Sequence, residues 1–169
     1  MALKVNEPLG KVDSLDLAEY VLFKGGKMSN LKLQKLLFYI QAYHLAYFEE
    51  PVIDDEFEAW VHGPVSRKVF AALKNSARLY DVLSYSHKEG EDTPDKVLDD
   101  HLTDEQIEAI DDVIEEFGTL SGLQLEKLTH SEDPWINARR GYAPADPCDK
   151  IIPKDEILNY YRNQLYTNS

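Results

Sequence analysis

Three polar side chains in residues 57–62 could act together. Glu58, Trp60 and His62 are spaced two apart, so in a β-strand a carboxylate, an indole N–H and an imidazole would share one face. Such a face suits a polar network that orients the strand, or a recognition patch, because tryptophan is frequent among interface hot spots. It also suits general acid–base catalysis by Glu58 and His62. The residues alone leave all three roles open.

A second polar and aromatic cluster follows later in the chain. Trp135 and Arg139 are four residues apart, so on a helix the guanidinium can stack on the indole. The structural interpretation is that Trp135 closes the core while His130 caps a helix end. The enzymatic interpretation is that His130 converges with Glu58 and His62 in a small hydrolase or nucleotide-processing enzyme. Whether the side chains of His62 and His130 lie close together or far apart distinguishes these interpretations.

Other catalytic and ligand-binding motifs are absent from the sequence. No two of the five histidines form an i, i+4 pair, so we expect no metal site. Cys148 is the single cysteine and lies in a Pro- and Asp-rich segment, where no helix N-terminus follows to lower its pKa. There is no Gly-x-Ser-x-Gly elbow and no phosphate-binding glycine loop. We therefore predict no catalytic residues and no cofactor.

The clearest element is a helix from about residue 29 to residue 48. Apolar residues recur three and four apart and also cover further faces, which predicts a central helix with neighbours on several sides. His44 is in phase with the apolar stripe and is predicted to be a hydrogen-bonded core histidine. Lys32, Gln34 and Lys35 begin the same helix, and we predict a solvated face there that could contact a partner.

Shorter helices and one hairpin complete the predicted fold. Asp13 caps a first helix, and capping boxes at Thr103 and Ser121 open two more. A turn carrying Trp135 and a last helix over 153–166 follow. Val52 and Ile53 are expected to pair with the strand at 57–62, and Gly63-Pro64 is expected to begin a helix. Residues 84–100 are expected to be an exposed loop without a core role. The predicted class is α+β, mainly α: a compact helical domain around a central buried helix with a small β-hairpin.

The length and the net charge of the chain limit the classes of protein to which it can belong. The 169 residues fit one domain, with a core over about 12–165 and a tail at 1–11. The 31 acidic and 18 basic side chains give a net charge of −13, which opposes nucleic-acid binding and favours basic partners. No apolar run approaches the ~20 residues of a membrane span, and no signal peptide is visible. We expect a cytoplasmic protein without a membrane partner.

Three segments follow one another along the chain: residues 31–44, residues 58–65 (Glu-Ala-Trp-Val-His-Gly-Pro-Val) and residues 125–135. In this order they resemble the Panacea domain family, also described as SocA-like antitoxins or a phage-associated family. The resemblance covers roughly residues 12–165. Positions that match the family pattern and that we expect to be structural are Leu33, Leu36, Leu37, His44, Gly63, Pro64, His130, Pro134 and Trp135.

This resemblance implies an antitoxin that neutralises a cognate toxin, encoded beside it, by direct protein–protein binding. It also implies that some members deliver their toxin to a AAA+ protease. The surface we expect to bind the partner combines Glu58, Trp60 and His62 with Lys32, Gln34 and Lys35. Residues 84–100 and 142–152 match no family motif, and there partner choice could differ. The alternatives are the enzyme described above and a scaffold protein without a toxin.

Overall fold

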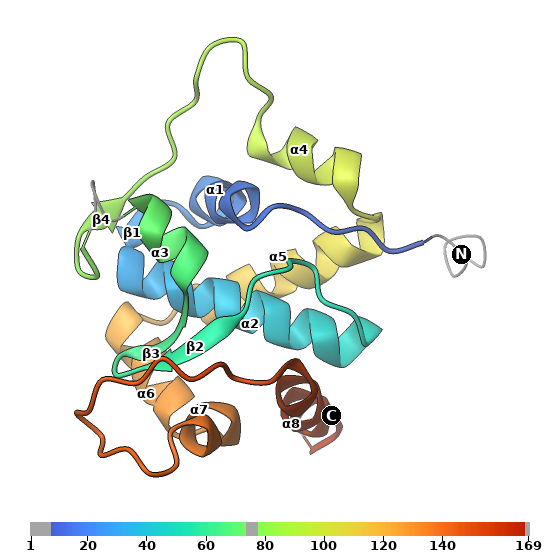
Figure 1. Cartoon of the computed structure of the whole chain (residues 1–169). Coiled ribbons are helices and arrows are strands. Elements are labelled where there is room, and N and C mark those ends of the chain that lie inside the picture. The colour runs from blue at the N-terminus through green and yellow to red at the C-terminus, as the bar shows by residue number, and fades with distance from the viewer. Residues whose placement is uncertain (1–7, 74–77, 168–169) are drawn as a thin grey trace.

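The computed structural model describes residues 8–73 and 78–167, and these ranges form eight helices and two small antiparallel sheets (Figure 1). The helices are α1 (Ser14–Gly25), α2 (Asn30–Phe48), α3 (Arg67–Leu73), α4 (Pro94–His101), α5 (Asp104–Phe117), α6 (Gly122–His130), α7 (Asp133–Ala138) and α8 (Lys154–Thr167). The strands β1 (Met28–Ser29) and β4 (Val82–Leu83) pair with each other, as do β2 (Phe57–Trp60) and β3 (Gly63–Ser66). The mainly helical α+β class is confirmed.

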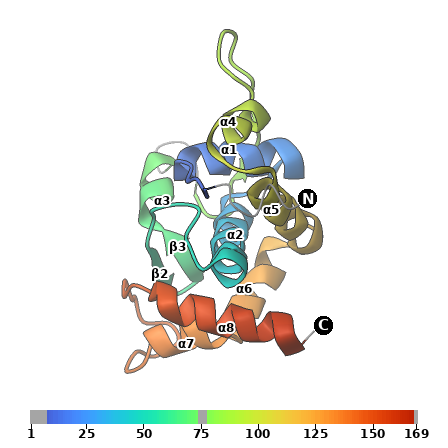
Figure 2. The ribbon, with the colours of Figure 1, turned by 90° about the vertical axis from the view of Figure 1, so that its right-hand side faces the viewer.

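Helix α2 runs through the centre of the molecule, as its apolar residues on several faces predict. Leu33, Leu36 and Leu37 are fully buried. Figure 2 shows α2 with α1 and α4 on one side, α7 and α8 on the opposite side, and α5 and the β2–β3 hairpin flanking it. The Ser29 side chain caps its N-terminus by accepting from the Lys32 N–H. Because α2 has neighbours on several sides, its polar side chains as well as its apolar ones contact other segments of the chain.

Caps set the boundaries of the surrounding helices where the sequence predicted them. Asp13 accepts from the Leu15 N–H at the start of α1. Both capping boxes form: Thr103 with Gln106 opens α5, and Ser121 with Gln124 opens α6. Each box satisfies backbone N–H groups that a helix start leaves unpaired. These local signals are confirmed because they depend on residues within one turn of each other.

His44 is the hydrogen-bonded core histidine that its position predicted. It is 1% exposed. Its Nδ1 donates to the Glu50 carbonyl at 2.6 Å, and its Nε2 accepts from Gln106 Nε2 at 3.0 Å. Burial lowers the pKa of His44 to about 4, so the ring is neutral near pH 7. Gln106 also donates to the Gly10 carbonyl at 2.8 Å, which ties the N-terminal segment to α5.

Two expectations about the hairpin are wrong. Its partner strands are 57–60 and 63–66, joined by the Val61-His62 turn, with Trp60 opposite Gly63. Val52 and Ile53 instead lie fully buried beside α2, where Gln41 Oε1 accepts from the Val52 N–H at 2.9 Å. Gly63-Pro64 begins a strand and not a helix, and α3 starts only at Arg67. Val52 and Ile53 do not pair with β2 because both side chains are buried in the core beside α2.

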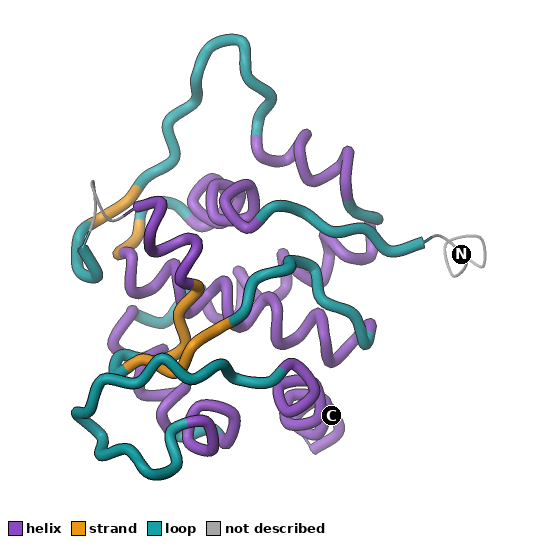
Figure 3. Tube along the Cα trace, viewed as in Figure 1, coloured by secondary structure: helices purple, strands orange, loops and turns teal. Residues whose placement is uncertain are grey.

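The segment 84–100 divides into two parts. Residues 84–93 are a loop that projects from the body (Figure 3). Residues 94–101 form α4, so the expectation of a loop throughout is wrong. Pro94 fits the first turn of this helix, and Leu98 is fully buried against the body. One buried leucine in eight residues makes no visible period, which is why the sequence concealed the helix.

Residues 8–11, which were expected to belong to a tail, contact the body. The Gly10 N–H donates to Gln106 Oε1 at 3.1 Å, and Lys11 pairs with Asp54 at 2.7 Å. Residues 1–7 of the expected tail lie outside the described residues. Within the described ranges, no helix has both the length and the apolar character that crossing a bilayer would require.

Candidate functional site

The β2–β3 hairpin presents the first cluster. Phe57 and Ala59 face the core while Glu58 and Trp60 are half-buried on the other face, the alternation expected of a strand. His62 lies in the turn and not in the strand, so the expectation that all three residues share one strand face holds only for Glu58 and Trp60. His62 and Trp60 nevertheless line one surface pocket.

The Trp60 side chain is held in place by its neighbours. Its Nε1 donates to Glu58 Oε1 at 2.9 Å, and Arg67 grips the same carboxylate with two donors at 2.7 and 2.9 Å. The guanidinium lies 5.5 Å from the indole centroid, and Phe70 packs edge-on at 5.0 Å. Hydrogen bonding from Arg67 lowers the pKa of Glu58, which keeps it ionised as an acceptor. A large aromatic side chain is thus fixed before any partner arrives.

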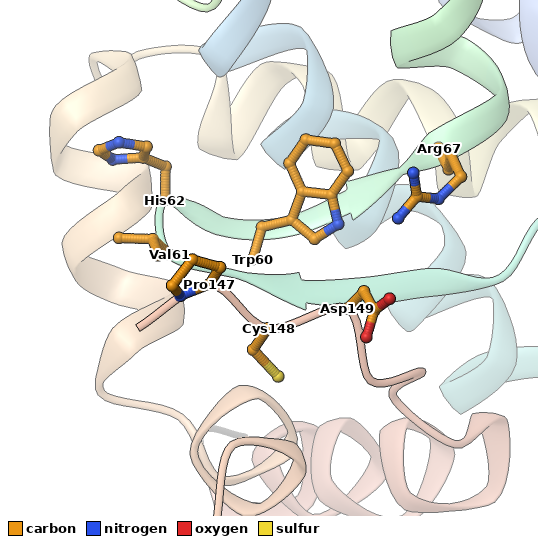
Figure 4. A pocket seen from close by; sticks show the side chains of 7 residues that line it. All are labelled: Trp60, Val61, His62, Arg67, Pro147, Cys148 and Asp149. Carbon is orange, nitrogen blue, oxygen red and sulfur yellow. The ribbon is translucent and has the colours of Figure 1, made fainter. Parts of the chain in front are cut away.

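A pocket of about 450 Å³ opens beside this indole. Figure 4 shows Trp60 between His62 and Arg67, with residues 147–149 forming the opposite wall. That wall is anchored to the hairpin, since the Ala59 N–H donates to the Lys150 carbonyl at 2.8 Å and the Ile152 N–H to the Phe57 carbonyl at 2.8 Å. Residues 150–152 therefore cover the edge of β2 that β3 leaves open.

The second cluster lies directly behind the hairpin. Trp135 Nε1 donates to the Trp60 carbonyl and Arg139 Nη1 to the Ala59 carbonyl, each at 2.8 Å. The guanidinium lies 5.0 Å from the Trp135 centroid, which confirms the predicted stacking. Arg139 also donates to the Ala143 and Asp146 carbonyls at 2.9 and 2.6 Å. It therefore fixes the loop that leads into the pocket wall.

His130 lies against this second cluster. Its ring stacks on Trp135 with centroids 4.0 Å apart, and its Nε2 is buried without a partner among the described residues. Burial lowers the pKa of His130. Pro134, like Trp135, is buried at the start of α7. The expectation that Trp135 closes the core is confirmed by its 9% exposure.

The three side chains of the enzymatic interpretation have separate partners. His62 Nδ1 lies 3.2 Å from Glu126 Oε1, Glu58 is held by Arg67, and His130 stacks on Trp135. Among the described residues, no hydrogen bond joins any two of them. A nucleophile or base that is poised for catalysis contacts the group that activates it. Glu58, His62 and His130 are therefore not assembled into the catalytic centre that the enzymatic interpretation requires.

The start of α2 corrects part of the predicted surface. Gln34 and Lys35 are both 0% exposed, so the expectation of a solvated or partner-contacting position is wrong for them. The Gln34 amide pairs with the outer edge of β3, accepting from the Ser66 N–H at 2.9 Å. Lys35 Nζ donates to the Pro64 carbonyl at 2.8 Å. Lys32 alone stays partly exposed, and its Nζ donates to the Gly118 carbonyl at 2.6 Å.

Sequence reasoning missed the groups that shape the pocket. Arg67 and Asp149 lack a family motif and a helical period, and Glu126 has no feature that marks it as the partner of His62. The only available signal was negative, because residues 142–152 match no family motif. In the part of the chain that the structure describes, no three His, Cys, Asp or Glu side chains gather to hold a metal.

These features define a mainly helical domain in which one buried helix supports a surface hairpin. The chain belongs to the family described as "Antitoxin SocA-like, Panacea domain", whose model matches residues 33–136. It is similar to the Antitoxin SocA of Caulobacter vibrioides (strain NA1000 / CB15N), with 29% identity over 160 residues that cover 83% of this chain and 80% of the relative. No solved structure matches the chain. The matched range contains the hairpin, Lys35, His130 and Trp135.

Proposed function

We propose that this chain is an antitoxin that neutralises a cognate protein toxin by binding it directly. The family and the relative named Antitoxin SocA support this role. We place the contact on the Trp60 surface, which we define as Trp60, His62, Arg67, Pro147 and Asp149. The observation that carries this placement is the half-buried Trp60 indole, fixed by Glu58 and Arg67 at the rim of a pocket of about 450 Å³.

A fixed tryptophan beside a pocket is suited to protein recognition. Tryptophan and arginine dominate the binding energy of many interfaces, and they contribute most where they are central and well packed. Because Trp60 is already oriented, binding loses little side-chain entropy. The pocket beside it can receive one apolar side chain of the toxin, which would bury Trp60 and Pro147 further. His62 and Asp149 would then contribute polar contacts at the rim.

Trp60→Ala tests the placement. We expect it to abolish rescue of growth when the chain is co-expressed with the neighbouring toxin gene, and to weaken binding of purified toxin by at least about 2 kcal/mol, as for an interface hot spot. Thermal unfolding of the same variant, measured alone, separates lost binding from lost folding. Phe23→Ala, an aromatic truncation at a 39% exposed position of α1, is the matched control and should rescue fully.

Two outcomes count against the proposal. If the neighbouring gene is harmless alone, or if its toxicity is unaffected by this chain, the antitoxin role fails. If Trp60→Ala binds toxin like the unmodified protein, the role survives but the Trp60 surface does not. Arg67→Ala provides an independent check of the surface. It removes the contacts of Arg67 with Glu58 and with the indole, but it keeps the aromatic group.

The mode of neutralisation is measured separately. Blocking of the toxin by bound antitoxin leaves the toxin's half-life in cells unchanged. Delivery to a AAA+ protease shortens that half-life, and the shortening disappears when the protease is deleted. Comparing the toxin's half-life with and without the antitoxin in both strains assigns one of these modes.

A further inference from the structure

A second concave surface lies between α2, α5 and α8, three helices that contribute no residue to the Trp60 surface. We call it the aromatic groove and define it by Tyr43, Tyr47, Asp112, Glu116 and Phe117, which line a volume of about 230 Å³. Tyr47 is 54% exposed at its rim. Its walls are thus aromatic, and two carboxylates stand along one side.

The aromatic walls are packed from behind. Phe117 stacks on Tyr39 with ring centroids 4.6 Å apart and planes 2° from parallel. The Tyr39 hydroxyl donates to Glu132 Oε1 at 2.6 Å, and the Tyr161 hydroxyl donates to the same oxygen at 2.8 Å. Tyr43 contacts both Phe117 and Tyr161, with centroids 5.7 and 5.4 Å away. The rings of Tyr43 and Phe117 are therefore fixed by the core.

The groove also concentrates negative charge. Asp112 and Glu116 are one helical turn apart, an arrangement in which like charges repel. Among the described residues, no lysine or arginine forms an ion pair with either one. Arg162, which α8 brings to the end of α2, is already engaged with the Ala46 carbonyl and Glu49. Desolvation, together with the charges of Glu132 and Glu116, raises the pKa of Tyr43.

We infer that the aromatic groove binds the guanidinium of an arginine side chain from a basic partner polypeptide. The planar guanidinium stacks on aromatic faces, and it bonds carboxylates through two parallel donors, so one group satisfies Tyr47, Phe117 and Glu116 together. A volume of about 230 Å³ accommodates this head group. The net charge of −13 attracts a basic chain to the surface before the side chain enters.

The test needs no toxin, so its result is independent of the proposed function. The ¹⁵N- and ¹³C-labelled full chain is titrated with N-acetyl-arginine methylamide and, separately, with the neutral citrulline analogue of the same shape. We expect saturable shifts at Tyr47 and Phe117 with the arginine compound, and at least tenfold weaker binding of citrulline. Tyr47→Leu keeps an apolar side chain but removes the ring, and should weaken arginine binding about threefold.

Glu116→Gln should weaken arginine binding about tenfold, because a charge-assisted hydrogen bond is lost. Glu115→Gln is the matched control: it makes the same charge change on the neighbouring, exposed residue of α5, which does not line the groove, and should change affinity less than twofold. The inference is overturned if citrulline binds as tightly as arginine. It is equally overturned if both glutamate variants lose affinity alike, or if the shifts map outside the groove.

Discussion

Lys35 is a single buried side chain that links α2 to the hairpin. Its ammonium position is fully enclosed, and its hydrogen bond runs to the Pro64 carbonyl, next to the hairpin turn. Burial lowers the pKa of Lys35 to about 7, an effect that the charge of Glu126 partly opposes. The side chain therefore gives up much of its charge on folding in order to hold β3 against α2.

This burial makes stability depend on pH. Between the folded pKa of about 7 and the ordinary value of 10.5, the unfolded chain keeps a proton on Lys35 that the folded chain has released. The free energy of unfolding therefore rises with pH in this window, by at most about 1.4 kcal/mol per pH unit from this group. Below pH 7 both states hold the proton, and the contribution to the slope ends.

Lys35→Met tests this dependence at the residue scale. Methionine approximates the volume but cannot titrate, so the rise in stability between pH 7.5 and 9 should shrink by about 1–2 kcal/mol relative to the unmodified chain. Urea denaturation at both pH values measures it. Lys27→Met, at an exposed position, should keep the full rise. Equal slopes in the Lys35 variant and the unmodified chain would contradict the assignment.

At the scale of elements, the hairpin is positioned by neighbouring segments as well as by the pairing of its own two strands. Residues 150–152 cover one edge of β2, and Gln34 pairs with the outer edge of β3. Trp135 and Arg139 hold the carbonyls of Trp60 and Ala59 from behind. A two-stranded hairpin is marginal by itself, so these contacts give the Trp60 surface its fixed geometry.

Gly63 directly follows the hairpin turn and packs closely against Lys35 and Thr129. Its φ is +102°, and a Cβ there would lie 2.4 Å from Lys35 Cε and 2.9 Å from Thr129 Oγ1. Gly63→Ala should therefore cost the left-handed penalty of about 1–2 kcal/mol and about 1–3 kcal/mol more for overpacking. Gly90→Ala is the control, because its φ is +87° and nothing lies within 4 Å. Chemical denaturation should show a clearly larger loss for Gly63→Ala, and equal losses would refute the packing argument.

At the scale of the whole molecule, the net charge and the two proposed contact surfaces would act over different distances. The net charge of −13 acts over the Debye length of about 8 Å at physiological salt. The proposed contacts at the Trp60 surface and in the aromatic groove would form only once the partner touches the surface. They lie on different parts of the fold, so a basic partner that covers both would wrap around α2 and its neighbours.

This difference in range predicts a kinetic signature. Raising NaCl from 50 to 500 mM should slow association with a basic toxin about tenfold or more while changing dissociation little, because steering is screened and contact is not. Stopped-flow mixing measures the first rate, and surface plasmon resonance measures the second. Trp60→Ala should do the opposite, speeding dissociation at either salt concentration. An association rate that ignores salt would show that the acidic surface plays no part in the encounter.

The sequence by itself determined the features that arise from neighbours along the chain. The central helix, its apolar faces, the Asp13 cap and both capping boxes follow from residues within one or two turns of each other. The three family segments were also visible without a structure. His44 could be placed in the core because its phase on the helix matched the leucines.

Only the tertiary structure decided which polar residues face solvent and which strands pair. Lys32, Gln34 and Lys35 look alike in sequence, yet two are buried because β3 brings backbone groups to them that need partners. The pairing of β2 with β3, the pocket beside Trp60 and the aromatic groove each join segments that are distant in the chain. Such contacts depend on how the whole core closes, and no local pattern encodes them.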